Sequence, residues 1–124
     1  MITGAVKSDE ARIGLEVKGR RGRVQEVEAV IDSGYTGTLT LPPALITILD
    51  LRWRSVGRAT LADGSTCVFQ VFVSKLVWDG KMRQILVDEA DTEPLIGMRL
   101  LRGHELKMQV RYRGKVTIER LPRR

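Results

Sequence analysis

Cysteine, histidine and aromatic residues are scarce in this chain of 124 residues, and each scarcity excludes a class of site. The single cysteine, Cys67, rules out an intrachain disulfide, and with one histidine, His104, the chain has no Cys/His cluster with metal-ligand spacing. The apolar neighbour Val68 and a predicted strand position indicate that Cys67 is an inert thiol packed as a small hydrophobic side chain. We therefore expect neither a bound metal nor a cofactor.

Long apolar runs are also missing, so we expect no membrane-spanning segment and no membrane partner. The first ten residues lack the charged and then apolar segments of a secretory signal, which predicts a cytoplasmic protein. The length suits a single domain over residues 1–124, and a hydrophobic share of 43% is enough to build its core.

Acidic residues are fewer than basic ones: the chain has 15 Asp and Glu and 21 Lys and Arg, which gives a formal net charge of +6. The basic run at residues 18–23 and the C-terminal arginines raise the hypothesis of nucleic-acid binding through Arg20, Arg21 and Arg23. Proteins that stack bases usually interleave aromatic and basic residues, whereas aromatics make up 5% of this chain and are absent from residues 20–23. Nucleic acid is therefore not the expected partner, and this hypothesis ranks third.

The chain is rich in segments that alternate apolar and polar residues with period two between glycine turns, which predicts a mainly β protein. Asp63-Gly64 and Asp79-Gly80 lie between such segments and predict hairpin turns. Pro42-Pro43 before an apolar stretch predicts a short helix to residue 49, because proline fits the first helical turn. Residues 98–102 are expected to form a helical turn, and the acidic stretch 88–93 is interpreted as a solvated loop. Strands are expected over residues 13–18, 24–31, 38–41, 54–62, 66–78, 81–87, 104–112 and 115–118.

The segment Val30-Ile31-Asp32-Ser33-Gly34 carries the strongest functional signal. Two apolar residues lead from a predicted strand into a carboxylate, a hydroxyl and a glycine. A carboxylate at the end of a buried strand needs hydrogen-bond donors or a shared proton, so Asp32 is either a turn cap or a reactive acid. A second apolar run, Leu95-Ile96-Gly97, also ends in glycine and leads toward a short helix.

Four segments stand in one order along the chain: Asp32-Ser33-Gly34, Leu39-Thr40-Leu41-Pro42, the Asp63-Gly64 hairpin and Leu95-Ile96-Gly97-Met98-Arg99-Leu100-Leu101. In that order they resemble the retropepsin-like (clan AA) aspartic proteases, in particular the small prokaryotic type whose signature reads Asp-Thr-Gly-Phe. The resemblance covers residues 24–110. It implies a closed β-barrel with one or two short helices that works as a homodimer.

The resemblance also implies a role for each motif. Tyr35 departs from the small residue of the viral enzymes, and its ring could narrow the cleft or form one wall of it. Arg99 stands where Asp is usual, which bears on surface pairing more than on chemistry. The implied site consists of the catalytic Asp32, the active-site turn Ser33, Gly34, Tyr35 and Thr36, the flap Ala62, Asp63, Gly64 and Ser65 over the substrate, and the supporting motif Leu95, Ile96 and Gly97.

The chain contains one Asp-Ser-Gly triplet. Peptide hydrolysis by an aspartic protease needs two acids that share a proton. A second copy must therefore supply another Asp32 across a two-fold axis. We expect an aspartic endopeptidase that cleaves an extended peptide or protein as a homodimer. The alternative is a noncatalytic dimer of the same fold that binds peptides or proteins and uses Asp32 as a turn cap.

Overall fold

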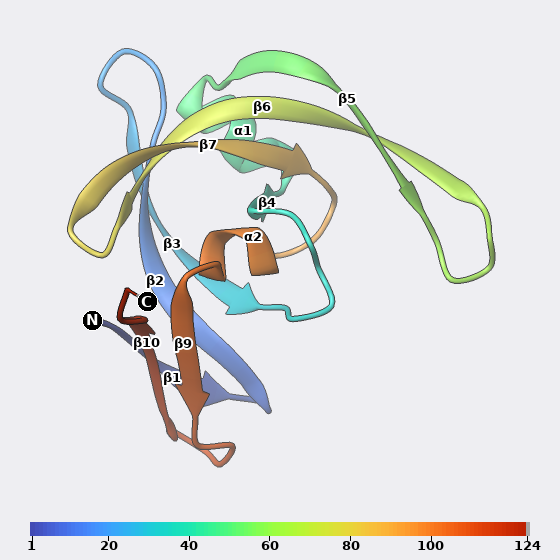
Figure 1. The fold of residues 1–124 in the computed structure, drawn as a ribbon. Helices are drawn as coiled ribbons and strands as arrows, with labels where there is room; N and C mark the ends of the chain where they lie inside the picture. The colour runs from blue at the N-terminus through green and yellow to red at the C-terminus, as the bar shows by residue number, and fades with distance from the viewer. Residues whose placement is uncertain (124) are drawn as a thin grey trace.

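The computed structural model describes residues 1–123, which form one ten-stranded sheet and two short helices (Figure 1). The prediction of a mainly β protein is confirmed. The strands are β1 (Ile2–Lys7), β2 (Glu10–Lys18), β3 (Val24–Ile31), β4 (Leu39–Leu41), β5 (Arg52–Thr60), β6 (Thr66–Trp78), β7 (Lys81–Glu89), β8 (Leu95–Ile96), β9 (His104–Met108) and β10 (Lys115–Arg120), and the helices are α1 (Pro43–Leu49) and α2 (Met98–Leu101).

The β2–β3 hairpin shows why the alternating residues fold as strands. Successive side chains of a strand point to opposite faces, so an alternating sequence buries one face. β2 pairs antiparallel with β3 over residues 12–18 and 24–30, as predicted. The buried side chains of β2 stand at every second position: Ala11, Ile13, Leu15 and Val17.

One additional pairing joins two strands that are distant in the order of the sheet. In sheet order the strands run β5-β6-β7-β4-β8-β3-β2-β1-β10-β9, and β6 also pairs with β2 through residues 75–77 and 16–18. Because of this extra pairing, β2, β3, β8, β4, β7 and β6 form a continuous circuit of hydrogen-bonded strands. Its core includes side chains with no exposed surface, such as Leu39, Leu41, Leu76, Val87 and Ile96.

Helix α1 begins and ends where its sequence predicts. Pro42 precedes it in extended conformation and Pro43 occupies its first turn, where a missing N–H costs no hydrogen bond. Ile46 and Leu49 are buried, and the helix ends at Asp50, which has a left-handed φ of 52°. Neither α1 nor α2, the helices of residues 1–123, has the length and apolar character needed to cross a membrane.

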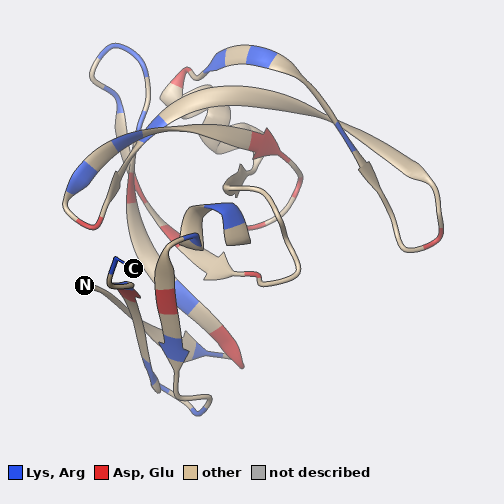
Figure 2. Cartoon of the chain, viewed as in Figure 1, with Lys and Arg blue, Asp and Glu red and all other residues tan. Residues whose placement is uncertain are grey.

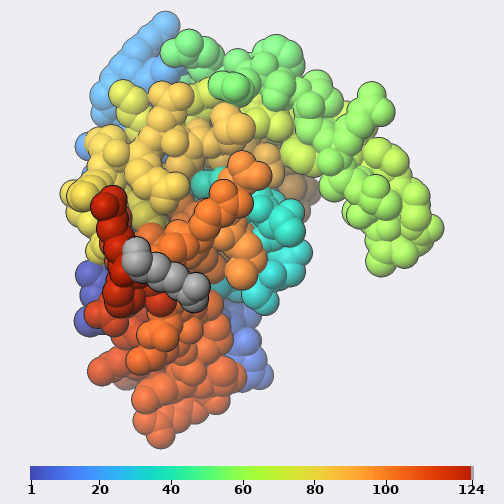
Figure 3. All heavy atoms as spheres, viewed as in Figure 1, coloured from blue at the N-terminus to red at the C-terminus, as the bar shows by residue number. Residues whose placement is uncertain are grey.

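The long β5–β6 hairpin reaches out from the body of the molecule (Figures 1 and 3). Its turn contains Asp63-Gly64, as predicted, and residues 58–68 are all exposed. The expectation that Cys67 packs as a core residue is therefore wrong, although it does lie in a strand. The outer half of the hairpin extends beyond the core, so its side chains meet solvent.

Several predicted boundaries also differ from the structure. Strand β1 was not predicted, β2 begins at Glu10 and not at residue 13, and β5 covers Arg52–Thr60 where residues 54–62 were expected. Strand β7 continues through Asp88 and Glu89, which pair with β4, so the first part of the acidic stretch belongs to the sheet and is half-buried. Strand β9 ends at Met108, because the backbone of residues 109–114 folds into a turn before β10. The pairing with β4 extends β7, and the turn at residues 109–114 ends β9.

Replacing Leu76 by alanine tests the core of the strand circuit. Leu76 is fully buried on β6, so its truncation should lower the free energy of unfolding by about 2–5 kcal/mol. Leu86→Ala on β7 is the matched control, because Leu86 is 41% exposed and its truncation should cost less than about 0.5 kcal/mol. Urea denaturation of both variants measures the difference, and equal losses would contradict the assigned core.

Candidate active site

Asp32 is the first residue after β3, and strand β8 fixes its position. β3 and β8 run parallel, with Val30 opposite Leu95 and Ile31 opposite Ile96. The Asp32 N–H donates to the Ile96 carbonyl oxygen at 2.9 Å, which extends the pairing by one residue. The backbone of Asp32 is therefore fixed by the sheet, although this residue lies just beyond the end of β3.

The turn itself orients the Asp32 carboxylate. The Gly34 N–H donates to Asp32 Oδ1 at 2.9 Å, and the Tyr35 N–H donates to the Asp32 carbonyl oxygen at 3.1 Å. Asp32 is half-buried, while Ser33 and Gly34 are exposed. Among residues 1–123, Gly34 is the one hydrogen-bond donor to this carboxylate. The Oδ2 atom of Asp32 therefore remains available to a second group.

The Leu95-Ile96-Gly97 segment supports the loop after Asp32 by direct contact. Three successive N–H groups donate to this loop: Gly97 to the Thr38 carbonyl at 3.1 Å, Met98 to Tyr35 at 2.8 Å and Arg99 to Gly37 at 3.1 Å. A Cβ atom at Gly97 would overlap the Gly37 carbonyl oxygen. Residue 97 must therefore be glycine for the two segments to approach this closely.

Tyr35 has a partner that the sequence reasoning missed. Its hydroxyl donates to Asp88 Oδ2 at 2.6 Å, which joins the active-site turn to the end of β7. Burial, and then the bond to the Asp88 carboxylate, raise the pKa of Tyr35 well above its usual range. The Tyr35 hydroxyl was the one signal in the sequence for such a bond, because a half-buried tyrosine hydroxyl usually has a hydrogen-bond partner.

A cleft of about 730 Å³ lies between this turn and the β5–β6 hairpin. Tyr35 and Asp88 line one side, while Val68 and Phe69 of β6 line the other. Tyr35 thus forms part of the wall of this cleft. Neither Asp32 nor residues 62–65 line this cleft, so a single chain does not bring the predicted acid and flap tip together.

Side-chain hydrogen bonds hold the turn at the tip of the hairpin. Asp63 Oδ1 accepts hydrogen bonds from the Ser65 hydroxyl at 2.6 Å and the Ser65 N–H at 2.8 Å. These bonds, the hydroxyl first, lower the pKa of Asp63. Gly64 has φ of 86°, which glycine adopts without strain. Ala62, Asp63, Gly64 and Ser65 are all exposed.

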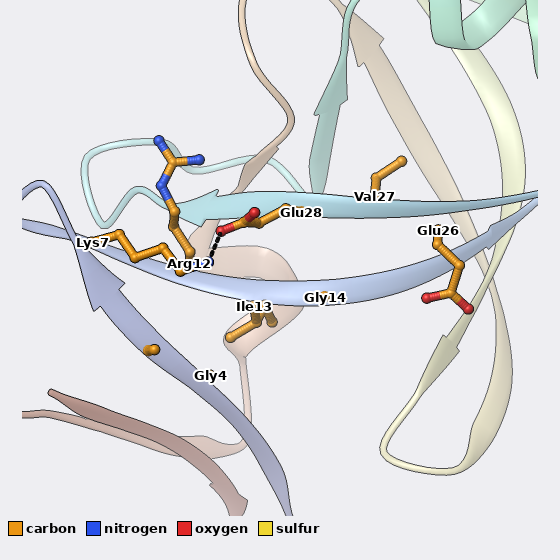
Figure 4. Close-up of a pocket in the computed structure, with 9 residues that line it drawn as sticks. Gly4, Lys7, Arg12, Ile13, Gly14, Glu26, Val27 and Glu28 are labelled. Atoms are coloured by element: carbon orange, nitrogen blue, oxygen red, sulfur yellow. Dashed lines mark hydrogen bonds and ion pairs between the residues drawn. The ribbon is translucent and has the colours of Figure 1, made fainter. Parts of the chain in front are cut away.

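Arg12 ties the segment before β8 to β2. Its guanidinium donates to Glu93 at 2.9 Å and to Glu10 at 2.6 Å, and these bonds, Glu93 first, raise the pKa of Arg12. Glu93 lies in an exposed loop, as predicted, and it forms its ion pair with Arg12 there, one residue before Pro94. Figure 4 shows Arg12 beside a shallow hollow over β1–β3, where Lys7 also pairs with Glu28 at 3.3 Å.

The remaining candidates lie apart from Asp32. His104 on β9 contacts Trp78, with ring centroids 5.7 Å apart, whereas Cys67 is on the exposed hairpin. In the part of the chain that the structure describes, no group of three or more His, Cys, Asp or Glu side chains could hold a metal ion.

No protein-family model matches the chain, and no curated protein matches it. The interpretation of the site therefore depends on its residues and geometry.

Replacing Tyr35 by phenylalanine tests the link to Asp88. Loss of the hydroxyl should lower the free energy of unfolding by about 1 kcal/mol at neutral pH. The unfolded chain loses the phenolic proton near pH 10, whereas the folded chain keeps it to higher pH. Wild-type stability should therefore fall more steeply above about pH 10 than that of Tyr35→Phe. Tyr112→Phe, at a side chain that is 76% exposed, is the control and should keep the wild-type slope.

Replacing Gly97 by alanine tests the contact that supports the active-site loop. The new methyl group would overlap the Gly37 carbonyl, so the free energy of unfolding should fall by about 1–3 kcal/mol. Gly14→Ala is the control, because a Cβ atom there meets nothing within 4 Å. Thermal unfolding of both variants provides the comparison, and a Gly97→Ala midpoint equal to that of Gly14→Ala would remove the proposed constraint.

Proposed function

We propose that this chain is an aspartic endopeptidase of the retropepsin-like type, active as a homodimer with one Asp32 from each copy. The observation that carries the proposal is the Asp32 turn. β8 and the first residues of α2 hold its backbone, while its carboxylate keeps one oxygen without a donor from residues 1–123. Such an acid is rigidly placed and still open to a reactant.

The chemistry explains why two copies are needed. Hydrolysis of a peptide bond requires a water to become nucleophilic while the carbonyl becomes electrophilic. One Asp32 carboxylate would accept the proton of the water, and the protonated Asp32 of the second copy would donate to the carbonyl oxygen. The two acids would share one proton between them.

The exposed surface of the turn suits this pairing. Ser33 and Gly34 lie on the surface beside Asp32, so a two-fold axis through this region would bring two turns face to face. In the proposed dimer, the Ser33 hydroxyl bonds across the axis and holds the turns together. The circuit of β2, β3, β8, β4, β7 and β6 would then be the closed barrel of this protein class.

The cleft and the hairpin support an extended peptide as the substrate. The hairpin presents Cys67, Val68 and Phe69 to the cleft from one side, which offers apolar surface to a substrate side chain. A peptide in this cleft would be recognised as an added strand, with backbone hydrogen bonds for affinity and pockets for alternate side chains. Closure of the hairpin over it would exclude water.

One observation favours the noncatalytic alternative. The bond from the Gly34 N–H to Asp32 Oδ1 is the bond of an Asx turn, so Asp32 also serves as a cap of its own turn. The same dimer could bind a peptide in the cleft without cleaving it. The two functions differ in whether Asp32 is needed for hydrolysis.

Replacing Asp32 by asparagine separates these functions. If the acid is catalytic, cleavage of an unstructured protein should fall by roughly a thousandfold or more, because an essential catalytic group is lost. Asp9→Asn is the matched control, since Asp9 is exposed in the β1–β2 turn and should leave activity unchanged.

Size-exclusion chromatography with light scattering would establish that Asp32→Asn remains a folded dimer. Undiminished cleavage by this variant would remove Asp32 from the mechanism. An inert wild type that still binds peptides would support the noncatalytic module.

A further inference from the structure

A basic pocket of about 480 Å³ lies at the other end of β3 from Asp32. Figure 2 shows Lys and Arg gathered on the β2–β3 loop and on the start of β5, the segments that meet there. The polar lining includes Ser74 and Gln84 but no aromatic side chain. Its cationic side chains are Lys18, Arg20, Arg21, Arg52 and Lys75.

The β2–β3 loop at this pocket is held in place and is not a free basic turn. The Arg20 N–H donates to the Leu49 carbonyl at 3.1 Å, and Arg20 Nε donates to the Asp50 carbonyl at 2.7 Å. Arg23 Nη1 donates to the Ile48 carbonyl at 2.9 Å. Both arginines thus bind the carbonyl end of α1 and hold the loop against the helix, and Arg20 also lines the pocket.

The positive charge of the pocket exceeds the negative charge near it. Asp50 pairs with Arg20 at 2.9 Å and with Arg21 at 3.8 Å, and Glu16 pairs with Lys18 at 3.6 Å. Two carboxylates therefore accompany five cations, and three positive charges are left over. In contrast, Lys7 and Arg12 beside the hollow of Figure 4 are each paired with a glutamate.

Arg52 and Lys75 account for two of the three positive charges that no carboxylate neutralises. Both side chains are exposed, and neither forms an ion pair or a side-chain hydrogen bond with any residue in the range 1–123. Arg52 begins β5 and Lys75 lies in β6. The strands therefore place two unneutralised cations beside the ordered arginines of the loop.

We propose that this pocket binds a small anion of high charge density, namely a diphosphate or triphosphate group. Guanidinium groups bind phosphate oxygens in pairs, and each ammonium adds a compact positive charge. Three unneutralised cations around one pocket match three or more negative charges held on adjacent phosphates. A carboxylate-bearing peptide carries at most one negative charge on each residue, so it would offer the pocket a lower charge density.

The pocket is separate from the proposed reaction centre. β3 runs from Val24, beside the basic loop, to Ile31, next to Asp32. Its seven steps of about 3.3 Å span about 23 Å, so an anion in the pocket cannot contact Asp32. The phosphate site is therefore independent of the proposed peptidase activity, and each can fail without the other.

Isothermal titration calorimetry with sodium tripolyphosphate tests the site directly. The wild type should bind at low salt, and the double variant Arg52→Gln, Lys75→Gln should bind roughly tenfold or more weakly, because charge-assisted hydrogen bonds are lost. The control Lys107→Gln, Arg111→Gln makes the same charge change on β9 and its turn, at the far end of the molecule in Figure 1, and should bind as the wild type does.

Further arms of the titration distinguish the source of the phosphates. Equal affinities for tripolyphosphate and adenosine triphosphate would support recognition of the phosphate chain alone. Binding of single-stranded oligothymidine that weakens in the same double variant would extend the site to nucleic-acid phosphates. Absence of tripolyphosphate binding at low salt, equal losses in both double variants, or tighter binding of a glutamate peptide would each overturn the proposal. Asp32→Asn should bind tripolyphosphate as the wild type does.

Discussion

The parallel pairing of β3 with β8 is the constraint on which the candidate site depends. It joins Val30 and Ile31 to Leu95 and Ile96, and the bond from the Asp32 N–H to the Ile96 carbonyl continues it into the turn. Parallel strands cannot be joined by a tight turn, so the chain between them must form a long connection. Here that connection contains β4, α1 and the β5–β6 hairpin, so the hairpin beside the cleft belongs to this connection.

Local signals in the sequence predicted much of this structure. Alternation predicted the β2–β3 hairpin, Asp63-Gly64 predicted the turn of the long hairpin, and Pro42-Pro43 predicted α1. Each depends on residues close together in the chain, where backbone preferences and turn chemistry decide the outcome. The same is true of the position of Asp32 at the end of its strand.

Long-range contacts could not be predicted in this way. The bond between Tyr35 and Asp88 and the ion pair between Arg12 and Glu93 join residues 53 and 81 positions apart. Both depend on which strands become neighbours and in which register, which one sequence does not reveal. The exposure of Cys67 was missed for a related reason, because a strand pattern does not show how far a hairpin extends beyond the core.

In the proposed enzyme each chain supplies half of the reaction centre, and a crystal structure of the purified protein tests that claim most directly. The decisive quantity is the separation of the two Asp32 carboxylates in a symmetric dimer. We predict that they face each other within hydrogen-bonding distance, directly or through one water. A monomer, or a dimer in which the Asp32-Ser33-Gly34 turns point away from each other, would contradict the assignment as an aspartic peptidase.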